Sequence, residues 1–167
     1  SRAYYKLWEI LRACSIEVDV ETQQTLHLCE APGGFVQACI DTFGTALNWY
    51  ACSLPSTQGG PKFSQRLDSR RICVHDSCSD LLNDTHRRAL VSHLHERGCG
   101  RYALVTADGP APMDHDHLEE SAAPLLAAEI EVALAVLAKG GSMVVKFFEG
   151  CAPETYQLLY GAATQFE

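Results

Sequence analysis

One stretch near the start of the chain decides the fold, Thr25-Leu26-His27-Leu28-Cys29-Glu30-Ala31-Pro32-Gly33-Gly34-Phe35. Its first part, residues 25–29, is short and mostly apolar, as is typical of a buried strand. Residues 30–34 hold a proline and two glycines, and the pattern of residues 35–43 is helical. In such a turn the glycines let the backbone approach a ligand, and the helix N-terminus offers free N–H groups. The stretch therefore predicts the first strand-to-helix unit of an α/β fold.

The rest of the chain alternates helical and strand patterns without a repeat or a linker. We expect helices over residues 2–14, 35–43, 83–96, 121–138 and 153–163. We expect strands over residues 25–29, 47–52, 71–75, 102–106 and 142–148. Pro124 then falls in the first turn of its helix, and Lys139-Gly140-Gly141 ends that helix. With right-handed crossovers, this order predicts one domain, residues 1–167, with a doubly wound and mostly parallel sheet.

Composition and charge narrow the class of protein. The chain has 167 residues, of which 47% are hydrophobic, enough for one core. Its longest apolar stretch, residues 132–138, is far shorter than the ~20 residues that span a bilayer, so we expect no membrane association. The net charge of −8 argues against coating nucleic acid by bulk electrostatics. However, the first 101 residues hold eleven basic and eleven acidic residues, so this part is able to carry a basic face.

The eight cysteines are scattered, and no two form a CxxC pair. Those inside apolar runs are Cys29, Cys39, Cys52 and Cys73. We interpret the cysteines as reduced core thiols, which favours a reducing compartment such as the cytoplasm. A zinc site is the alternative, because residues 73–78 and 93–99 each combine cysteine with histidine. Their spacings match no usual zinc pattern, and no metal is predicted.

Chemistry in a sheet of this type concentrates just after the strands. Asp108 follows the strand over residues 102–106, and Lys146 lies inside the apolar strand over residues 142–148. A charged lysine is costly to bury, so we expect it to have a partner. The alternatives are a turn-forming role for Asp108 and an edge-strand lysine that reaches water for Lys146.

Four blocks of the sequence together resemble the FtsJ/RrmJ-type S-adenosylmethionine-dependent RNA ribose 2′-O-methyltransferases. The blocks are Ser1-Arg2-Ala3-Tyr4-Tyr5-Lys6-Leu7, Leu28-Cys29-Glu30-Ala31-Pro32-Gly33-Gly34-Phe35, Asp108-Gly109 and Gly140-Gly141-Ser142-Met143-Val144-Val145-Lys146. Their order and spacing match over nearly the whole chain. The second block and the long loop over residues 53–68 are more similar to eukaryotic and viral mRNA cap methyltransferases than to bacterial ribosomal RNA enzymes. The resemblance implies a Rossmann-like methyltransferase fold.

The resemblance also implies a Lys-Asp-Lys-Glu tetrad beside S-adenosylmethionine, and three members match Lys6, Asp108 and Lys146. Methyl transfer to a ribose hydroxyl requires removal of its proton and alignment of its oxygen with the methyl group. Lys146 is the candidate base, Asp108 orients it near the transferred methyl, and Lys6 holds the hydroxyl. The residues predicted to bind the cofactor are Glu30, Ala31, Pro32, Gly33, Gly34, Phe35, Ser53, Asp76 and Asp108.

Within that set, Asp76 matches the adenine-contacting position of the family. Ser53 takes the place of the acidic residue that often binds the cofactor ribose. A larger departure concerns the fourth tetrad member, which the family carries on a strand after the last helix. Because the chain stops at Glu167, we expect a domain cut from a longer protein, before the last strands of the sheet. The alternative is an enzyme that lacks this glutamate.

RNA is the predicted partner, held by a local basic strip. The residues predicted to contact it are Arg2, Tyr4, Arg12, Lys62 and Arg66, whereas Tyr5 is expected to pack against its helix. The predicted function is 2′-O-methylation of the cap-proximal nucleotide of mRNA, in the cytoplasm or, for a cellular cap enzyme, the nucleus. The alternatives are a ribosomal or transfer RNA methyltransferase and a catalytically silent module of a larger, possibly viral, polyprotein. A Rossmann oxidoreductase is disfavoured because GxGxxG is absent.

Overall fold

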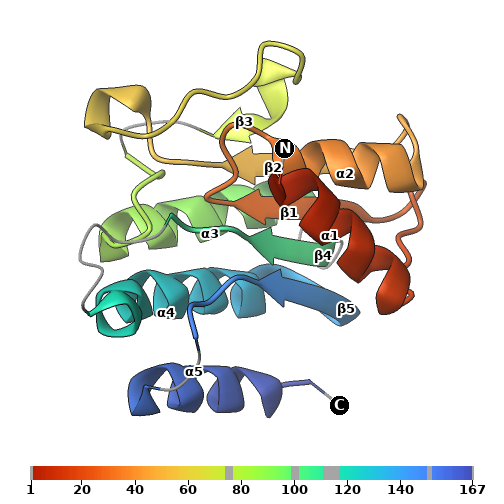
Figure 1. Ribbon diagram of the computed structural model, residues 1–167. Coiled ribbons are helices and arrows are strands. Elements are labelled where there is room, and N and C mark those ends of the chain that lie inside the picture. Colours follow the sequence, from red (N-terminus) through yellow and green to blue (C-terminus); the bar gives the residue numbers. More distant parts are fainter. Residues whose placement is uncertain (1, 74–76, 99–101, 111–116, 150–151, 167) are drawn as a thin grey trace.

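A parallel five-stranded sheet forms the centre of the protein (Figure 1). The computed structural model describes residues 2–73, 77–98, 102–110, 117–149 and 152–166. The strands are β1 (Gln24–Leu28), β2 (Asn48–Cys52), β3 (Ile72–Cys73), β4 (Tyr102–Ala107) and β5 (Leu137–Val145). They lie in the order β3-β2-β1-β4-β5, and every pair is parallel. The direction of winding therefore reverses between β1 and β4, which confirms the predicted doubly wound, Rossmann-like sheet.

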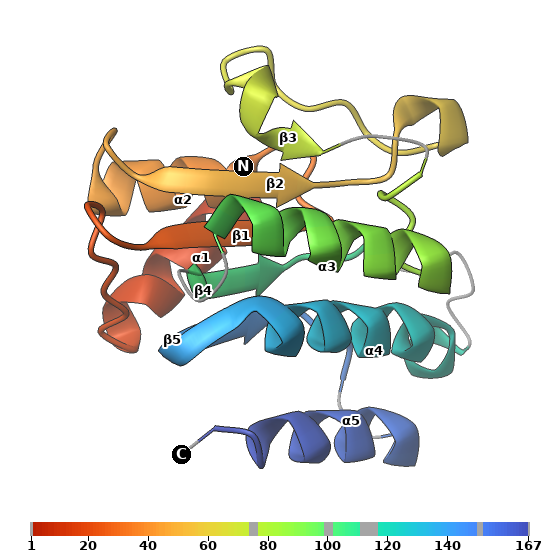
Figure 2. The ribbon, with the colours of Figure 1, turned by 180° about the vertical axis from the view of Figure 1, so that it is seen from behind.

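Four helices cover the two faces of this sheet, and a fifth lies beyond the β5 edge (Figures 1 and 2). The helices are α1 (Arg2–Ala13), α2 (Gly34–Phe43), α3 (Asp84–Gly98), α4 (Leu118–Val136) and α5 (Pro153–Ala163). α1 and α2 share one face, and α3 and α4 share the other. None of the helices in the described residues has the length and apolar character needed to cross a membrane.

The sheet separates two apolar cores. On one face, Leu7 and Leu11 of α1, one helical turn apart, pack with Val36 of α2 and Leu104 of β4. The opposite core contains side chains of α3 and α4 against β1 and β4, and its buried members include Leu26, Leu28, Leu90, Leu94, Val105, Val132 and Ala133. Burial of apolar surface on both faces makes β1 and β4 the most protected strands.

A short polar chain crosses the centre of the sheet. His27 is fully buried in β1, and its Nε2 lies 2.9 Å from Thr25 Oγ1. Its Nδ1 lies 2.8 Å from Thr106 Oγ1 of β4. Burial lowers the pKa of His27 to about 3, so the ring is neutral at neutral pH. Both ring nitrogens have partners, which removes most of the cost of burying a histidine here.

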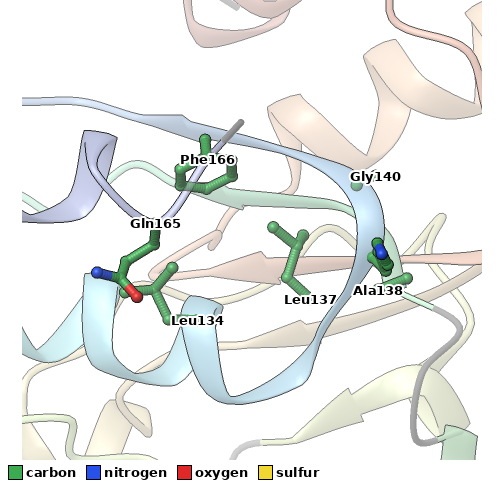
Figure 3. Close-up of a pocket in the computed structure, with 8 residues that line it drawn as sticks. Leu134, Leu137, Ala138, Gly140, Gln165 and Phe166 are labelled. Carbon is green, nitrogen blue, oxygen red and sulfur yellow. The ribbon is translucent and has the colours of Figure 1, made fainter.

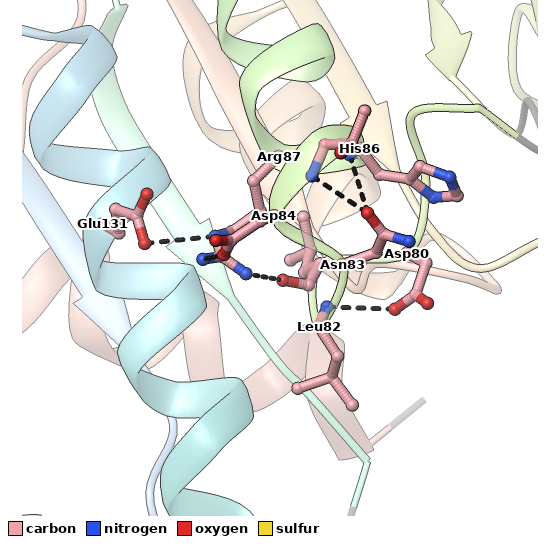
Figure 4. A network of polar contacts seen from close by, with 9 residues as sticks. Asp80, Leu82, Asn83, Asp84, His86, Arg87 and Glu131 are labelled. Carbon is pink, nitrogen blue, oxygen red and sulfur yellow. Dashed lines mark hydrogen bonds and ion pairs between the residues drawn. The ribbon is translucent and has the colours of Figure 1, made fainter.

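A polar network fixes the start of α3 against α4 (Figure 4). Asn83 Oδ1 accepts hydrogen bonds from the backbone N–H groups of Thr85 at 2.9 Å and His86 at 3.2 Å, so Asn83 is the N-terminal cap. Arg87 then donates to Leu81 O at 2.8 Å and to Glu131 Oε2 of α4 at 3.1 Å. This guanidinium also pairs with the carboxylate of Asp84.

The junction between α4 and β5 differs from the prediction. α4 begins at Leu118, so Pro124 lies inside the helix and not in its first turn. Residues 139–141 belong to β5 and do not end the helix. Leu137 pairs with Tyr102 and Ser142 with Leu104, so residues 138–141 bulge out of the ladder. Gly140 has a positive φ of 76°, which shows that this glycine serves a strand bulge.

The bulge borders a pocket of about 660 Å³ at the start of β5 (Figure 3). Its other lining side chains include Leu134 of α4 and Gln165 and Phe166 after α5. The pocket is therefore formed at the beginning of β5, whereas Lys146 follows the end of that strand.

Candidate active site

The turn over residues 30–34 is held together from within. Glu30 is 4% exposed, and its Oε1 accepts the backbone N–H groups of Phe35 at 2.7 Å and Val36 at 3.1 Å. These two donors of the α2 N-terminus are therefore not free for a ligand, contrary to the expectation from the sequence. Burial raises the pKa of Glu30 to about 8, although the two N–H groups act to lower it.

The loop after β2 packs on this turn. The backbone N–H of Ser64 donates to Pro32 O at 3.0 Å. Gly33 has a φ of 111°, and a Cβ placed on it would lie 2.3 Å from Leu67 Cδ1. Because Gly33 has no side chain, Leu67 of the loop packs close to its backbone. From the sequence we expected this space to be left for a ligand. Only glycine combines this backbone conformation with such a close neighbour.

Ser53 supports the same turn from the end of β2. Its side chain is buried, and its Oγ accepts the backbone N–H of Ala31 at 3.3 Å. The hydroxyl that we expected to bind the cofactor ribose is thus engaged with the turn. Asp76, the predicted adenine contact, lies outside the described residues.

Asp108 and Lys146 form an ion pair at the carboxyl edge of the sheet. Lys146 Nζ lies 2.9 Å from Asp108 Oδ1, and the two side chains are 28% and 25% exposed. β4 and β5 are neighbours, and the backbone N–H of Lys146 donates to Ala107 O at 3.0 Å. Lys146 follows β5 and does not lie inside it, because the strand ends at Val145. The expected partner is present, and both groups keep some access to solvent.

Lys6 lies on α1, where its side chain is exposed while the neighbouring Leu7 is buried. Within the described residues, no hydrogen bond or ion pair connects Lys6 to the pair formed by Asp108 and Lys146. The structure therefore brings two of the three predicted tetrad members into contact.

Sequence reasoning missed one side chain beside this pair, Glu129 of α4. It is 2% exposed and lies against Gly109. In the sequence, Glu129 could have been noticed as an acidic residue in the apolar middle of a predicted helix, between Ala128 and Ile130.

The predicted RNA contacts fall into two groups. Arg2 and Arg12 are exposed on α1, with the Arg12 guanidinium 4.6 Å from the centre of the Trp8 ring. Lys62 and Arg66 are exposed in the loop between β2 and β3.

The two tyrosines of α1 differ in their exposure. Tyr4 is half-buried, and its hydroxyl donates to Asp41 Oδ2 of α2 at 2.9 Å. Tyr5 was expected to pack against its helix, but it is 64% exposed. The ring of Tyr5 meets Tyr4 edge-on, with 5.1 Å between the ring centres. Tyr5 is therefore the more open of the two for contact with a ligand.

The charges at this edge fit the cofactor that the resemblance implies. Glu30, Asp108 and Glu129 supply three carboxyl groups, against one ammonium from Lys146. Asp108 raises the pKa of both glutamates, so the three groups interact. A ligand with positive groups relieves such crowding, and S-adenosylmethionine carries a sulfonium and an ammonium. The residues that would hold it are those of the turn over residues 30–35 and Asp108.

Two curated proteins similar to this chain carry the name cap-specific mRNA (nucleoside-2′-O-)-methyltransferase 2. The one from Drosophila melanogaster is 30% identical over 184 residues, and the one from Danio rerio is 29% identical over 189 residues. Each match covers 99% of this chain but only 26% or 25% of the relative. The chain thus spans about a quarter of the length of these relatives.

Among solved structures, an S-adenosyl-L-methionine methyl transferase from Silicibacter pomeroyi DSS-3 has the same fold. The TM-score is 0.55 at 14% identity, over 88% of this chain and 76% of the other. The sequence profile described as FtsJ-like methyltransferase matches residues 1–167. The family match also supports the predicted methyl donor, S-adenosylmethionine. Because the profile covers the whole chain, the protein belongs to the FtsJ-like methyltransferases, the family that the sequence resemblance predicted.

Proposed function

We propose that this domain transfers a methyl group from S-adenosylmethionine to a ribose 2′-hydroxyl of RNA, at the cap-proximal nucleotide of mRNA. The observation that carries the proposal is the ion pair of Lys146 and Asp108, 2.9 Å apart, at the carboxyl edge of an FtsJ-like domain. The cap is the finer part of the proposal, and it is supported by the names of the two curated relatives.

The pair can perform the proton transfer that this reaction needs. Lys146 in its neutral form takes the proton of the 2′-hydroxyl on Nζ, while the ribose oxygen forms its bond to the methyl carbon. Bound S-adenosylmethionine supplies an activated methyl group, whose bond to sulfur breaks to leave a neutral thioether. Asp108 holds Nζ in place and stabilises the ammonium that forms. Lys6, free of ion pairs among the described residues, is assigned to the hydroxyl itself.

RNA would be held by exposed groups of α1 and of the loop after β2. Arg2 and Tyr5 lie on α1, and Lys62 and Arg66 lie on the loop. Phosphate contacts by arginine and lysine make binding sensitive to salt, while an exposed aromatic ring provides a surface for base stacking. With only a few basic groups, we expect weak affinity that falls as salt rises from low to physiological concentration.

Methyl transfer to short RNA tests the proposal. The chain is incubated with labelled S-adenosylmethionine and with capped or uncapped RNA of the same sequence, and the position of the methyl is read by mass spectrometry. We expect transfer to the 2′-oxygen next to the cap, and a loss of at least about 100-fold in Lys146→Met and Asp108→Asn. Lys139→Met, in the bulge of β5, is the matched control and should keep the wild-type rate.

Calorimetry with S-adenosylmethionine separates the alternatives. Binding without transfer to any RNA would favour the catalytically silent module. Equal transfer to uncapped ribosomal or transfer RNA would replace the cap assignment. Full activity of either pair variant would refute the assigned roles of Lys146 and Asp108.

A further inference from the structure

A buried carboxyl group lies directly behind the proposed catalytic pair. Glu129 projects from α4, and a Cβ placed on Gly109 would lie 2.8 Å from its Oε1. Among the residues that the structure describes, this oxygen has no hydrogen-bond partner, although it is shielded from solvent. An unpaired buried carboxylate oxygen costs stability, so it calls for an explanation beyond packing.

The surroundings of Glu129 are the ends of three neighbouring strands. The charged or titratable groups that act on it are the thiol of Cys29 after β1, the carboxylate of Asp108 after β4 and the ammonium of Lys146 after β5. The backbone N–H of Gly109 also lowers the pKa of this carboxyl group, although no hydrogen bond joins it to Oε1. Burial raises the pKa of Cys29 well above its usual value, so this group stays a thiol and is able to donate.

Glu129 and Lys146 also share a cavity. The two side chains border a space of about 10 Å³ together with Gly109 and Phe148. A space of about this size is close to the minimum that holds one water molecule, so a single water can connect the two groups. Lys146 is therefore in direct contact with Asp108 and shares the cavity with Glu129.

We propose that Glu129 is a positioning residue that sets the pH at which Lys146 becomes a neutral base, through its charge and its hold on the turn at Gly109. The inference rests on the function proposed above. The negative charge of an ionised Glu129 stabilises an ammonium at Lys146, and an uncharged side chain at position 129 removes that stabilisation.

Two properties support this role. Burial raises the pKa of Glu129 to about 7, partly countered by Cys29, Lys146 and the Gly109 N–H, so its charge changes near neutral pH. Glu129 is also only 2% exposed and lies against Gly109. Glu129 thus acts through its neighbours.

Glu129→Gln tests the role, because glutamine keeps the size and the acceptor oxygen but removes the charge. Glu120→Gln is the matched control, since Glu120 is an exposed glutamate of the same helix. We expect the rising limb of kcat against pH to move down by roughly one pH unit in Glu129→Gln only. The affinity for S-adenosylmethionine should stay within about twofold of wild type in both variants.

A second readout does not need activity. Nitrogen-15 NMR follows Nζ of Lys146, assigned by its loss in Lys146→Met, as the pH is raised. We expect deprotonation about one pH unit lower in Glu129→Gln, and in the wild type a further change of this resonance near pH 7, where Glu129 ionises.

An unchanged titration in Glu129→Gln overturns the inference even if methyl transfer is intact. An inactive wild type whose variant still shows the shifted titration overturns only the proposed function. If Glu129→Gln fails to fold, a wild-type resonance without any step near pH 7 overturns the inference by itself.

Discussion

Acidification should weaken the folded state through His27 at the centre of the sheet. The ring is fully buried between Thr25 and Thr106, and its pKa falls from 6.5 to about 3. The folded pKa lies below the unfolded one, so the unfolded chain binds the proton first as the pH drops. The stability that neutral His27 contributes is present above pH 6.5 and is lost progressively down to about pH 3. At about 1.4 kcal/mol per unit, the loss between pH 7 and pH 5 is about 2 kcal/mol.

Glu30 and Glu129 act in the opposite direction. Burial raises their folded pKa values to about 8 and about 7, above the usual 4.5. The stability they contribute is present below pH 4.5 and is lost as the pH rises through these values. The pH dependence of wild-type stability therefore mixes the two effects. The contribution of His27 has to be measured as the difference between the wild type and a variant without this histidine.

His27→Gln supplies that difference, because glutamine offers a donor and an acceptor to the two threonines but does not titrate. Urea unfolding at pH 7 and pH 5, followed by fluorescence of the buried Trp49, gives the free energy of unfolding of both proteins. Between these pH values, the wild type should lose about 2 kcal/mol more than the variant. Equal changes in the two proteins would refute the reasoning.

Three substitutions test other parts of the fold. Gly33→Ala places a methyl group against Leu67 in a backbone with positive φ, so the affinity for S-adenosylmethionine, measured by calorimetry, should fall at least about tenfold. Gly44→Ala is the control, because Gly44 has a similar φ but open space around it, and this variant should keep the wild-type affinity. Leu11→Ala leaves a hole under α1 and should lower the free energy of unfolding in urea by about 2–5 kcal/mol. Arg87→Ala removes a donor shared by three acceptors, and a loss of about 1–3 kcal/mol is expected in the same assay, only partly restored by lysine.

A partner for Lys146 was predictable because a lysine in an apolar strand needs one, and the family resemblance pointed to Asp108. The neighbouring strands β4 and β5 bring the two together, although Lys146 follows β5 and does not lie inside it. The support around the turn was not predictable in the same way. Glu30 and Ser53 have the residue types of ligand contacts, but their side chains reach the backbone of the turn itself. A sequence pattern cannot distinguish an acceptor that serves a cofactor from one that serves a neighbouring N–H group.

The α4 and β5 junction shows a second limit. Two glycines after a helical pattern usually mark a helix end, yet Gly140 and Gly141 lie in a strand bulge. The bulge depends on the register between β4 and β5, which is a long-range property. The cytoplasmic or nuclear location, the polyprotein partners and the viral origin stay predictions, and so do the individual RNA contacts.

That bulge has a consequence for how the position of Lys146 responds to changes elsewhere in the chain. After it, Met143, Val144 and Val145 pair in regular register with β4, and Lys146 continues this alignment through its own backbone bond to Ala107 O. Side chains alternate between faces, so a one-residue slip there would turn Lys146 away from Asp108. Residues 138–141, being outside the ladder, can absorb a residue gained or lost upstream. We therefore expect insertions or deletions in the helix and loop that precede the bulge to leave the position of Lys146 unchanged.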